Sequence, residues 1–379
     1  MLILAISPDG LMSNGQLDVG LIQAMIRIAN QADNLVAVIS NHAKPSWFDY
    51  HFGQQKRVKF FEIAVRQNGK IISEIAKLKK ISPHDILVLA VKADDIAMAK
   101  NGRAVLVPAA WSREVRVRDL GLLIASPGEL EDLVNLTAGW QGQWWFEGHG
   151  ANYSVRALVD LSTYGKNISQ QEFARKLTAT AKGGGARLAA LLAIIARSML
   201  LSNIDQTANL LWGVYPSSSN VSKSPEVLTE FTRRLRTTTS LVRYATDGEP
   251  LFIRHSPSVK RSTAKGIDRN DATDQIMTLH LNPFYKGKIK GRNVVVIDDC
   301  TTYGLSFGVA AAFLKAAGAS SVHGVAIGKF GNQLSEFAIN ITGDVFSPIV
   351  DGEFHLASTR PFQGKNDSTT QDALKALIP

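Results

Sequence analysis

Short apolar runs alternate with segments of helical spacing through the first third of the chain. Helical spacing covers residues 19–29 and 94–100, and apolar runs of strand length occupy residues 2–6, 35–40, 60–65, 86–91 and 104–108. Continuous apolar strands that alternate with helices are typical of a parallel sheet covered on both faces. We therefore predict an α/β domain with a doubly wound parallel sheet over residues 1–125.

The same alternation returns after residues 126–150, which contain the string GWQGQWWFEGHG. Its tryptophans favour a domain junction packed by aromatic side chains, with base stacking as the alternative. The elements expected beyond the junction are helices over 168–202, with a break at the glycines 183–185, and over 306–317, and strands over 210–215, 293–297 and 321–327. They predict a second doubly wound α/β domain over residues 151–379.

The charge balance points to an anionic partner. The 379-residue chain has 42 basic and 33 acidic side chains, and most of the surplus lies in residues 221–295. Nucleic acid, a membrane surface or a phosphorylated small molecule would fit such a surplus. No membrane is expected, because the most apolar stretch, residues 188–201, is shorter than the roughly 20 residues of a span. The single cysteine, Cys300, allows no internal disulfide, so we expect a cytoplasmic protein.

The segment VVVIDDCTTYGLS, residues 294–306, is the most informative part of the sequence. An apolar strand leads into Asp298 and Asp299, and a short loop with hydroxyl side chains then leads into a helix. Backbone N–H groups and the helix dipole attract phosphate at such a junction. Carboxylates beside it would accept hydrogen bonds from ribose hydroxyls. The segment therefore predicts a site for a phosphorylated sugar, against the plainer alternative of an ordinary strand-to-helix turn.

This segment resembles the signature of the type I phosphoribosyltransferases, which binds phosphoribosyl pyrophosphate (PRPP). The acidic pair, the first hydroxyl, the glycine and the last hydroxyl all match, whereas Tyr303 stands where the family usually has a small residue. The resemblance implies Mg²⁺ bound with PRPP near Asp298 and Asp299. The PRPP-binding residues that it implies are Asp298, Asp299, Thr301, Thr302, Tyr303, Gly304, Leu305 and Ser306.

The resemblance extends to the flanking segments. The string GVYPSSSN resembles the family's pyrophosphate loop, here Pro216, Ser217 and Ser218, although the cation often found there is missing before Lys223. Residues 251–283 resemble the mobile loop of the competence-associated amidophosphoribosyltransferase-like branch. That loop implies catalytic cations that close on pyrophosphate, with Lys260, Arg261 and Lys265 as the candidates.

Residues 1–110 resemble the haloacid-dehalogenase-like (HAD) phosphatases, in particular the Cof-like branch. The string LILAISPDG resembles the first motif, but Ser7 replaces the nucleophilic aspartate while Asp9 keeps the acid–base position. Ser40 matches the phosphate-binding hydroxyl and Asp95 a metal-binding carboxylate, whereas Val91 replaces another metal ligand. Serine does not readily form the family's acyl-phosphate, so we expect a degenerate, inactive domain. The lysine of the third motif stays open among Lys77, Lys79 and Lys80.

Three functions remain open at this point. The first is a transferase that moves phosphoribosyl from PRPP to an unknown acceptor and releases pyrophosphate. The second is a module that senses PRPP or a nucleotide without turnover. The third is an effector of a bacterial defence or mobile-element system that binds nucleic acid, through residues 221–295, or a partner protein. A homo-oligomer is compatible with all three.

Overall fold

The computed structural model describes the chain except for residues 14, 32, 185, 220–225, 246–247, 260–267, 269, 332 and 378–379. The chain divides into two compact units. Unit 1 comprises Met1–Gly142, Ala189–Gln206 and Arg233–Thr246, and unit 2 comprises Gln143–Leu188, Thr207–Thr232 and Asp247–Pro379. Each unit contains a largely parallel sheet with helices, which confirms the predicted α/β fold class.

The sheet of unit 1 is parallel throughout, with the strand order β5-β4-β1-β6-β7. Its strands are β1 (Ile3–Ile6), β4 (Leu35–Ser40), β5 (Val58–Glu62), β6 (Ile86–Ala90) and β7 (Val105–Pro108). Successive strands are added on one side of β1 and then on the other, so β1 and its neighbour β6 flank the switch point of a doubly wound sheet. Ligands of such sheets bind outside the carboxyl ends of the strands at this point.

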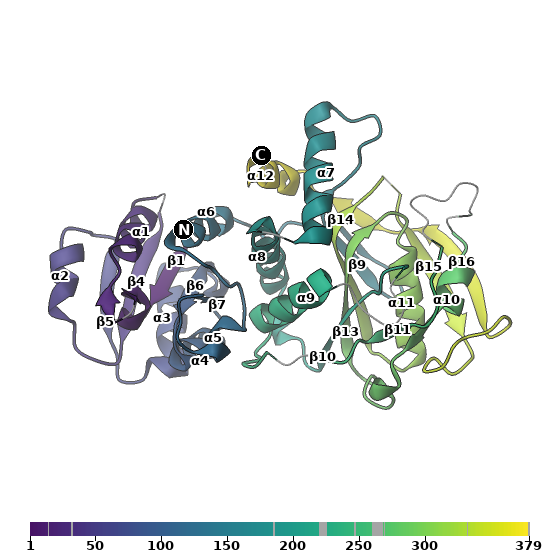
Figure 1. Cartoon of the computed structure of the whole chain (residues 1–379), viewed down its shortest axis with the longest axis horizontal. Helices are drawn as coiled ribbons and strands as arrows, with labels where there is room; N and C mark the ends of the chain where they lie inside the picture. The colour runs from purple at the N-terminus through teal and green to yellow at the C-terminus, as the bar shows by residue number, and fades with distance from the viewer. Residues whose placement is uncertain are drawn as a thin grey trace. The chain divides into compact units, whose positions relative to one another are not determined.

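Helices connect the strands of unit 1 (Figure 1). The crossover helices are α1 (Val19–Asn30), α2 (Ser46–Phe52), α3 (Lys70–Lys79) and α4 (Ala93–Gly102). Isoleucines of α3 and α4 cover one face of the sheet, where they pack against alternate residues of β1 and β6. The shorter elements are η1 (Pro8–Leu11), β2 (Met12–Ser13), β3 (Gln16–Leu17), η2 (Arg66–Asn68), η3 (Pro83–Asp85), α5 (Val115–Arg118), α6 (Pro127–Thr137) and η4 (Ile204–Gln206).

The sheet of unit 2 has the strand order β10-β13-β14-β9-β8-β17. Strands β10 (Leu210–Val214), β13 (Asn293–Thr301), β14 (Ser321–Lys329) and β9 (Ser154–Asp160) are parallel, whereas β8 (Phe146–His149) runs antiparallel to β9, and β17 (Gly364–Asn366) runs antiparallel to β8. Helix α11 (Leu305–Ala316) connects β13 to β14 and lies beside β15 (Figure 1). Its phenylalanines belong to the core of the unit.

The remaining elements of unit 2 surround this sheet. They are α7 (Ile168–Gly183), α10 (Thr273–Met277), η5 (Pro283–Tyr285), α12 (Thr369–Leu377) and the antiparallel pairs β11 (Phe252–Arg254) with β12 (Leu279–Leu281) and β15 (Ser335–Ile341) with β16 (Phe354–Pro361). Within the described residues, no single helix has the length and apolar character of a membrane span. The bent pair Ile168–Gly183 and Leu188–Leu201 meets that test only when its two helices are taken together across a 91° bend.

The division into units differs from the expected boundaries at 125 and 151. Helix α6, expected in the junction, packs on α1 in unit 1, whereas β8 belongs to the sheet of unit 2. Helices α8 (Ala186–Leu201) and α9 (Glu226–Thr239) are shared between the units, because the carboxyl-terminal part of each packs within unit 1. Trp140 and Trp144 are buried, and the Trp140 indole N–H donates to the Ser198 hydroxyl at 2.8 Å within unit 1.

Candidate functional site

The sequence-predicted PRPP motif lies at the carboxyl end of β13. The strand continues through Thr301, four residues beyond the predicted end at 297, because Asp298, Cys300 and Thr301 stay in register with β14. The loop is therefore short, and α11 begins at Leu305. Gly304 precedes the helix with φ of 85°, a left-handed conformation that favours glycine, and an added Cβ would lie 3.0 Å from the Ser335 carbonyl oxygen.

The two carboxylates of the motif lie in different surroundings. Asp298 is buried, and its oxygens accept hydrogen bonds from the Asp299 amide at 2.8 Å and from the Ser306 hydroxyl at 3.0 Å. Asp299 is half-buried, accepts the Cys300 amide at 2.6 Å and lies 3.9 Å from Lys182 Nζ of α7. Successive side chains of a strand alternate between faces, so one carboxylate is aimed toward α11 and the other toward α7.

Burial first, and then the charge of Asp299, raises the pKa of Asp298 well above its ordinary value. The same burial, reinforced by the Asp299 charge, raises the pKa of the Cys300 thiol, so this cysteine does not have the character of a reactive thiolate. The junction therefore holds a buried carboxyl beside a half-buried one, and a donor-rich or cationic ligand would stabilise the negative charge of the pair.

Mg²⁺ fits this site only in combination with a phosphorylated ligand. Among the described residues there is no group of three or more histidine, cysteine, aspartate or glutamate side chains that could hold a metal ion. Mg²⁺ is commonly held by one or two carboxylates together with substrate phosphates. Asp298 and Asp299 would be the protein's contribution to such a shared site.

The hydroxyl residues of the motif are not equivalent. Thr301 is buried, and its Oγ1 has no hydrogen-bond partner among the described residues. Thr302 and Tyr303 are half-buried, and the Tyr303 carbonyl accepts the Ser335 amide at 2.9 Å, which fixes the turn. The Ser306 hydroxyl is engaged by Asp298, so it must reorient to contact a phosphate.

The structure brings the expected pyrophosphate loop next to this motif. Strand β10 pairs with β13, and the Tyr215 amide donates to the Ile297 carbonyl at 2.9 Å, so Pro216–Ser218 leaves the sheet beside Asp298. The Ser218 carbonyl accepts the Ser258 amide at 2.9 Å. The expected catalytic cations Lys260, Arg261 and Lys265 lie outside the described residues.

Sequence reasoning missed two polar residues at the same edge of the sheet, Asp160 and Lys329. Lys329 pairs in register with Thr301 on one side and with Asp160 on the other. It is buried and donates to the Gly331 carbonyl. Burial lowers the pKa of Lys329 to about 8, an effect that Asp160 partly opposes. In the sequence, each of these two residues could have been noticed as a charged residue that ends an apolar strand.

Two arginines of α9, in the basic segment 221–295, donate hydrogen bonds to backbone carbonyls. In unit 1, Arg233 Nη1 donates to the Asp119 carbonyl at 3.3 Å, and Arg234 Nη1 donates to the Leu120 carbonyl at 3.1 Å. Guanidinium groups that satisfy backbone carbonyls have fewer donors left for phosphates. The structure therefore gives these arginines a role within the fold.

Unit 1 brings Ser7 and Asp95 together at the carboxyl ends of β1 and β6. The Ser7 hydroxyl donates to Asp95 Oδ2 at 3.3 Å, and the Val91 and Lys92 amides donate to the same oxygen at 2.9 and 3.0 Å. Asp9, which is half-exposed, forms an ion pair with Lys92 at 2.6 Å. The remaining predicted residue is Ser40, at the end of β4, whose hydroxyl accepts the His42 amide at 2.9 Å.

Arg66 is the residue of this region that sequence reasoning missed. Its guanidinium is buried and forms an ion pair with Asp95, and it lies 4.0 Å from Asp94. The Arg66 amide donates to Asn41 Oδ1 at 2.8 Å, which ties η2 to the end of β4. The candidates for a third-motif lysine are exposed at the end of α3: Lys77, Lys79 and Lys80.

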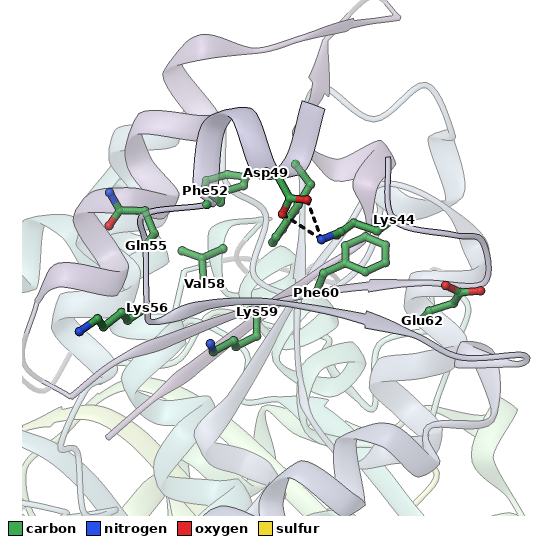
Figure 2. Close-up of a pocket in the computed structure, with 11 residues that line it drawn as sticks. Lys44, Asp49, Phe52, Gln55, Lys56, Val58, Lys59, Phe60 and Glu62 are labelled. Atoms are coloured by element: carbon green, nitrogen blue, oxygen red, sulfur yellow. Dashed lines mark hydrogen bonds and ion pairs between the residues drawn. The ribbon is translucent and has the colours of Figure 1, made fainter. Parts of the chain in front are cut away.

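A hollow of about 500 Å³ lies elsewhere in unit 1, between α2 and the edge strand β5 (Figure 2). Phenylalanine and valine side chains form its floor, and an ion pair between Lys44 and Asp49, at 2.7 Å, stands at its rim. None of the sequence-predicted site residues lines it. Its lining residues are Lys44, Phe48, Asp49, Phe52, Gly53, Gln55, Lys56, Val58, Lys59, Phe60 and Glu62.

No family model and no curated protein matches the sequence. Among solved structures, the cobalt-bound deoxy-D-mannose-octulosonate 8-phosphate phosphatase from Haemophilus influenzae is 12% identical, with 37% of this chain and 90% of that chain covered and a TM-score of 0.30. The 3-deoxy-D-manno-octulosonate 8-phosphate phosphatase from Moraxella catarrhalis, in complex with magnesium, phosphate and KDO, is 13% identical, with 35% and 84% covered and a TM-score of 0.30. At these TM-scores, the likeness does not assign the chain to their family.

Proposed function

We propose that unit 2 binds a phosphorylated ribose of the PRPP type, together with Mg²⁺, at the junction of β13 and α11. One observation carries the proposal: the buried Asp298 lies beside Asp299 at the glycine-capped start of a helix. The loop Pro216–Ser218 leaves the neighbouring strand at the same edge of the sheet. Carboxylates and a helix amino terminus match the two ends of this ligand class, its hydroxyls and its phosphate.

Ribose hydroxyls would donate to the acidic pair and thereby relieve its like-charge repulsion. The phosphate would lie over the first turn of α11, where backbone N–H groups have no partner within the helix. Thr302, a half-buried hydroxyl residue of the same loop, would contact it. When bound, Mg²⁺ would offset negative charge on the pyrophosphate group.

Transfer is the reaction that this site supports best. The acceptor's nucleophile would form a bond to the anomeric carbon while the bond to pyrophosphate breaks, and pyrophosphate would leave with the bonding electrons. Cations that approach the leaving group would stabilise that charge. Lys260, Arg261 and Lys265 remain the candidates from the sequence.

Binding without turnover is the second candidate function. Two observations favour it: Tyr303 stands where the resembled family has a small residue, and the Ser306 hydroxyl is already engaged by Asp298. A sensor needs the ligand site alone, whereas a transferase also needs an acceptor held in line with the anomeric carbon.

Calorimetry with PRPP and Mg²⁺ tests the proposal directly. We expect saturable heat from the wild-type chain, its loss in Asp298→Asn/Asp299→Asn, and its retention in the control Asp351→Asn, an exposed acid of unit 2. A wild-type chain that gives no heat would overturn both candidates. Pyrophosphate release when nucleobases or amines are offered separates the transferase from the sensor.

For unit 1, we propose a HAD-like module without phosphatase activity, because Ser7 replaces the nucleophile. No hydrolysis of p-nitrophenyl phosphate is expected from the wild-type chain. Hydrolysis that disappears in Asp9→Asn would contradict this part of the proposal.

A further inference from the structure

The carboxylates at the switch point of unit 1 are already neutralised by the chain's own cations. Asp95 is fully buried, and among the described residues it accepts hydrogen bonds from the Ser7 hydroxyl, the amides of Val91 and Lys92, and the Arg66 guanidinium. These contacts occupy both of its oxygens. A metal ion could bind Asp95 only by displacing Arg66 or by breaking the turn that begins α4.

The two other carboxylates near the switch point are engaged as well. Asp9 is 2.6 Å from Lys92 Nζ. Asp94 accepts a hydrogen bond from Gln67 Nε2 at 2.9 Å and lies 4.0 Å from the Arg66 guanidinium. Arg66 and Lys92 together carry the same charge as one Mg²⁺ ion.

The donor set left for a metal is correspondingly poor. Val91, where the HAD resemblance expects a metal-binding aspartate, is an apolar and buried residue. Within the described residues, Asp9, Asp94 and Asp95 do not form a group that could hold a metal ion. Mg²⁺ needs near-octahedral oxygen coordination, which a carboxylate saturated by protein donors does not offer.

We propose that Arg66 and Lys92 stand in for the divalent cation of the resembled family, so that unit 1 folds and holds these carboxylates in place without metal. Arg66 is the buried one of the two cations. It enters from η2 and connects the end of β4, through Asn41, to the start of α4, through Asp95. Lys92 is the exposed part and covers Asp9. This inference is independent of the proposed ligand of unit 2.

Manganese binding, followed by electron paramagnetic resonance of free Mn²⁺, tests the inference on the full chain. The Asp298→Asn/Asp299→Asn background removes the acidic pair of unit 2. We expect no saturable Mn²⁺ binding at millimolar concentrations, and no change in the melting temperature of unit 1 with Mg²⁺ or with EDTA. Stoichiometric Mn²⁺ binding, or a melting temperature lowered by EDTA, would overturn the inference without any further variant.

A gain of binding provides the second test. Among the described residues these carboxylates do not form a complete metal site. In the same background, Arg66→Met/Lys92→Met nevertheless removes both positive charges that repel a cation, so Mn²⁺ should bind weakly but at least tenfold more tightly than to the parent. Lys56→Met, at an exposed position of unit 1 between α2 and β5, is the control and should leave binding unchanged. Equal Mn²⁺ binding by a folded double variant and its parent would contradict the inference. Circular dichroism establishes whether the double variant is folded.

Discussion

The Arg66–Asp95 ion pair gives the sharpest test of the physical reasoning. Arg66→Met keeps a long, apolar side chain but leaves the Asp95 carboxylate buried beside no cation. Removal of one partner from a buried ion pair typically costs about 3–5 kcal/mol. For a domain of 150–250 residues, each kcal/mol lowers the melting temperature by about 2–4 °C. We therefore expect the unit 1 transition to fall by about 6–20 °C in differential scanning calorimetry.

A double-mutant cycle separates charge from packing in this prediction. Asp95→Asn alone leaves Arg66 only its distant contact with Asp94, at 4.0 Å, and should also destabilise unit 1. Arg66→Met/Asp95→Asn removes both charges of the buried pair and should recover most of the loss. Lys92→Met is the control, because it removes a half-exposed ion pair with Asp9 that contributes at most about 1 kcal/mol. A cost of Arg66→Met no larger than that of this control, or a double variant as unstable as the single one, would show that the buried ion pair does not stabilise unit 1.

Three further predictions concern stability and pH. Because burial raises the pKa of Asp298, the stability that unit 2 has with this carboxyl protonated is lost as pH rises through that pKa. At neutral pH, Asp298→Asn should therefore raise the melting temperature of unit 2 while abolishing PRPP binding. A lower melting temperature would contradict this. Gly304→Ala should lose about 1–2 kcal/mol of unfolding free energy for the left-handed φ, and more for the clash of its Cβ with Ser335. Gly352 has a similar φ of 86° and open space around it, so Gly352→Ala should lose only the amount due to φ. Urea unfolding measures both variants. Burial lowers the pKa of Lys100 from its ordinary value of 10.5 to about 7, so the stability of unit 1 should rise with pH between these two values. Lys100→Met should remove this rise when the free energy of unfolding is measured against pH. An unchanged rise in the variant would refute the assignment to Lys100.

Much of the secondary structure could be predicted because it depends on local apolar pattern. The strands 35–40 and 86–91 and the helix 306–317 agree with β4, β6 and α11 to within one residue at each end. Gly318 follows that helix with φ of 87°, as its predicted closing role requires. These elements are continuous and buried, so their sequence carries the signal.

The site could be predicted in composition but not in detail. Asp298 and Asp299 have little intrinsic preference for strands, and only pairing with β14 extends β13 across them. The contact of Arg66 with Asp95 depends on η2 and α4 meeting in space, and no local period records such a contact. The role of Lys329 could not be predicted for the same reason, because its neighbours Thr301 and Asp160 lie on other strands.

Unit 1 consists of three segments of the chain that are separated by segments of unit 2, and this affects how the protein folds during synthesis. Arg197, which pairs with Asp85 at 2.6 Å, and Thr237, whose hydroxyl accepts the Gly121 amide at 2.9 Å, follow β9 of unit 2 in the chain. During synthesis, the amino-terminal sheet emerges first, but its last packing partners are translated only with the segment 233–246. Nascent chains that stop earlier would present unfinished apolar surface to chaperones and proteases. Unit 1 therefore cannot complete its packing until the first segments of unit 2 have been translated, although each unit has its own sheet.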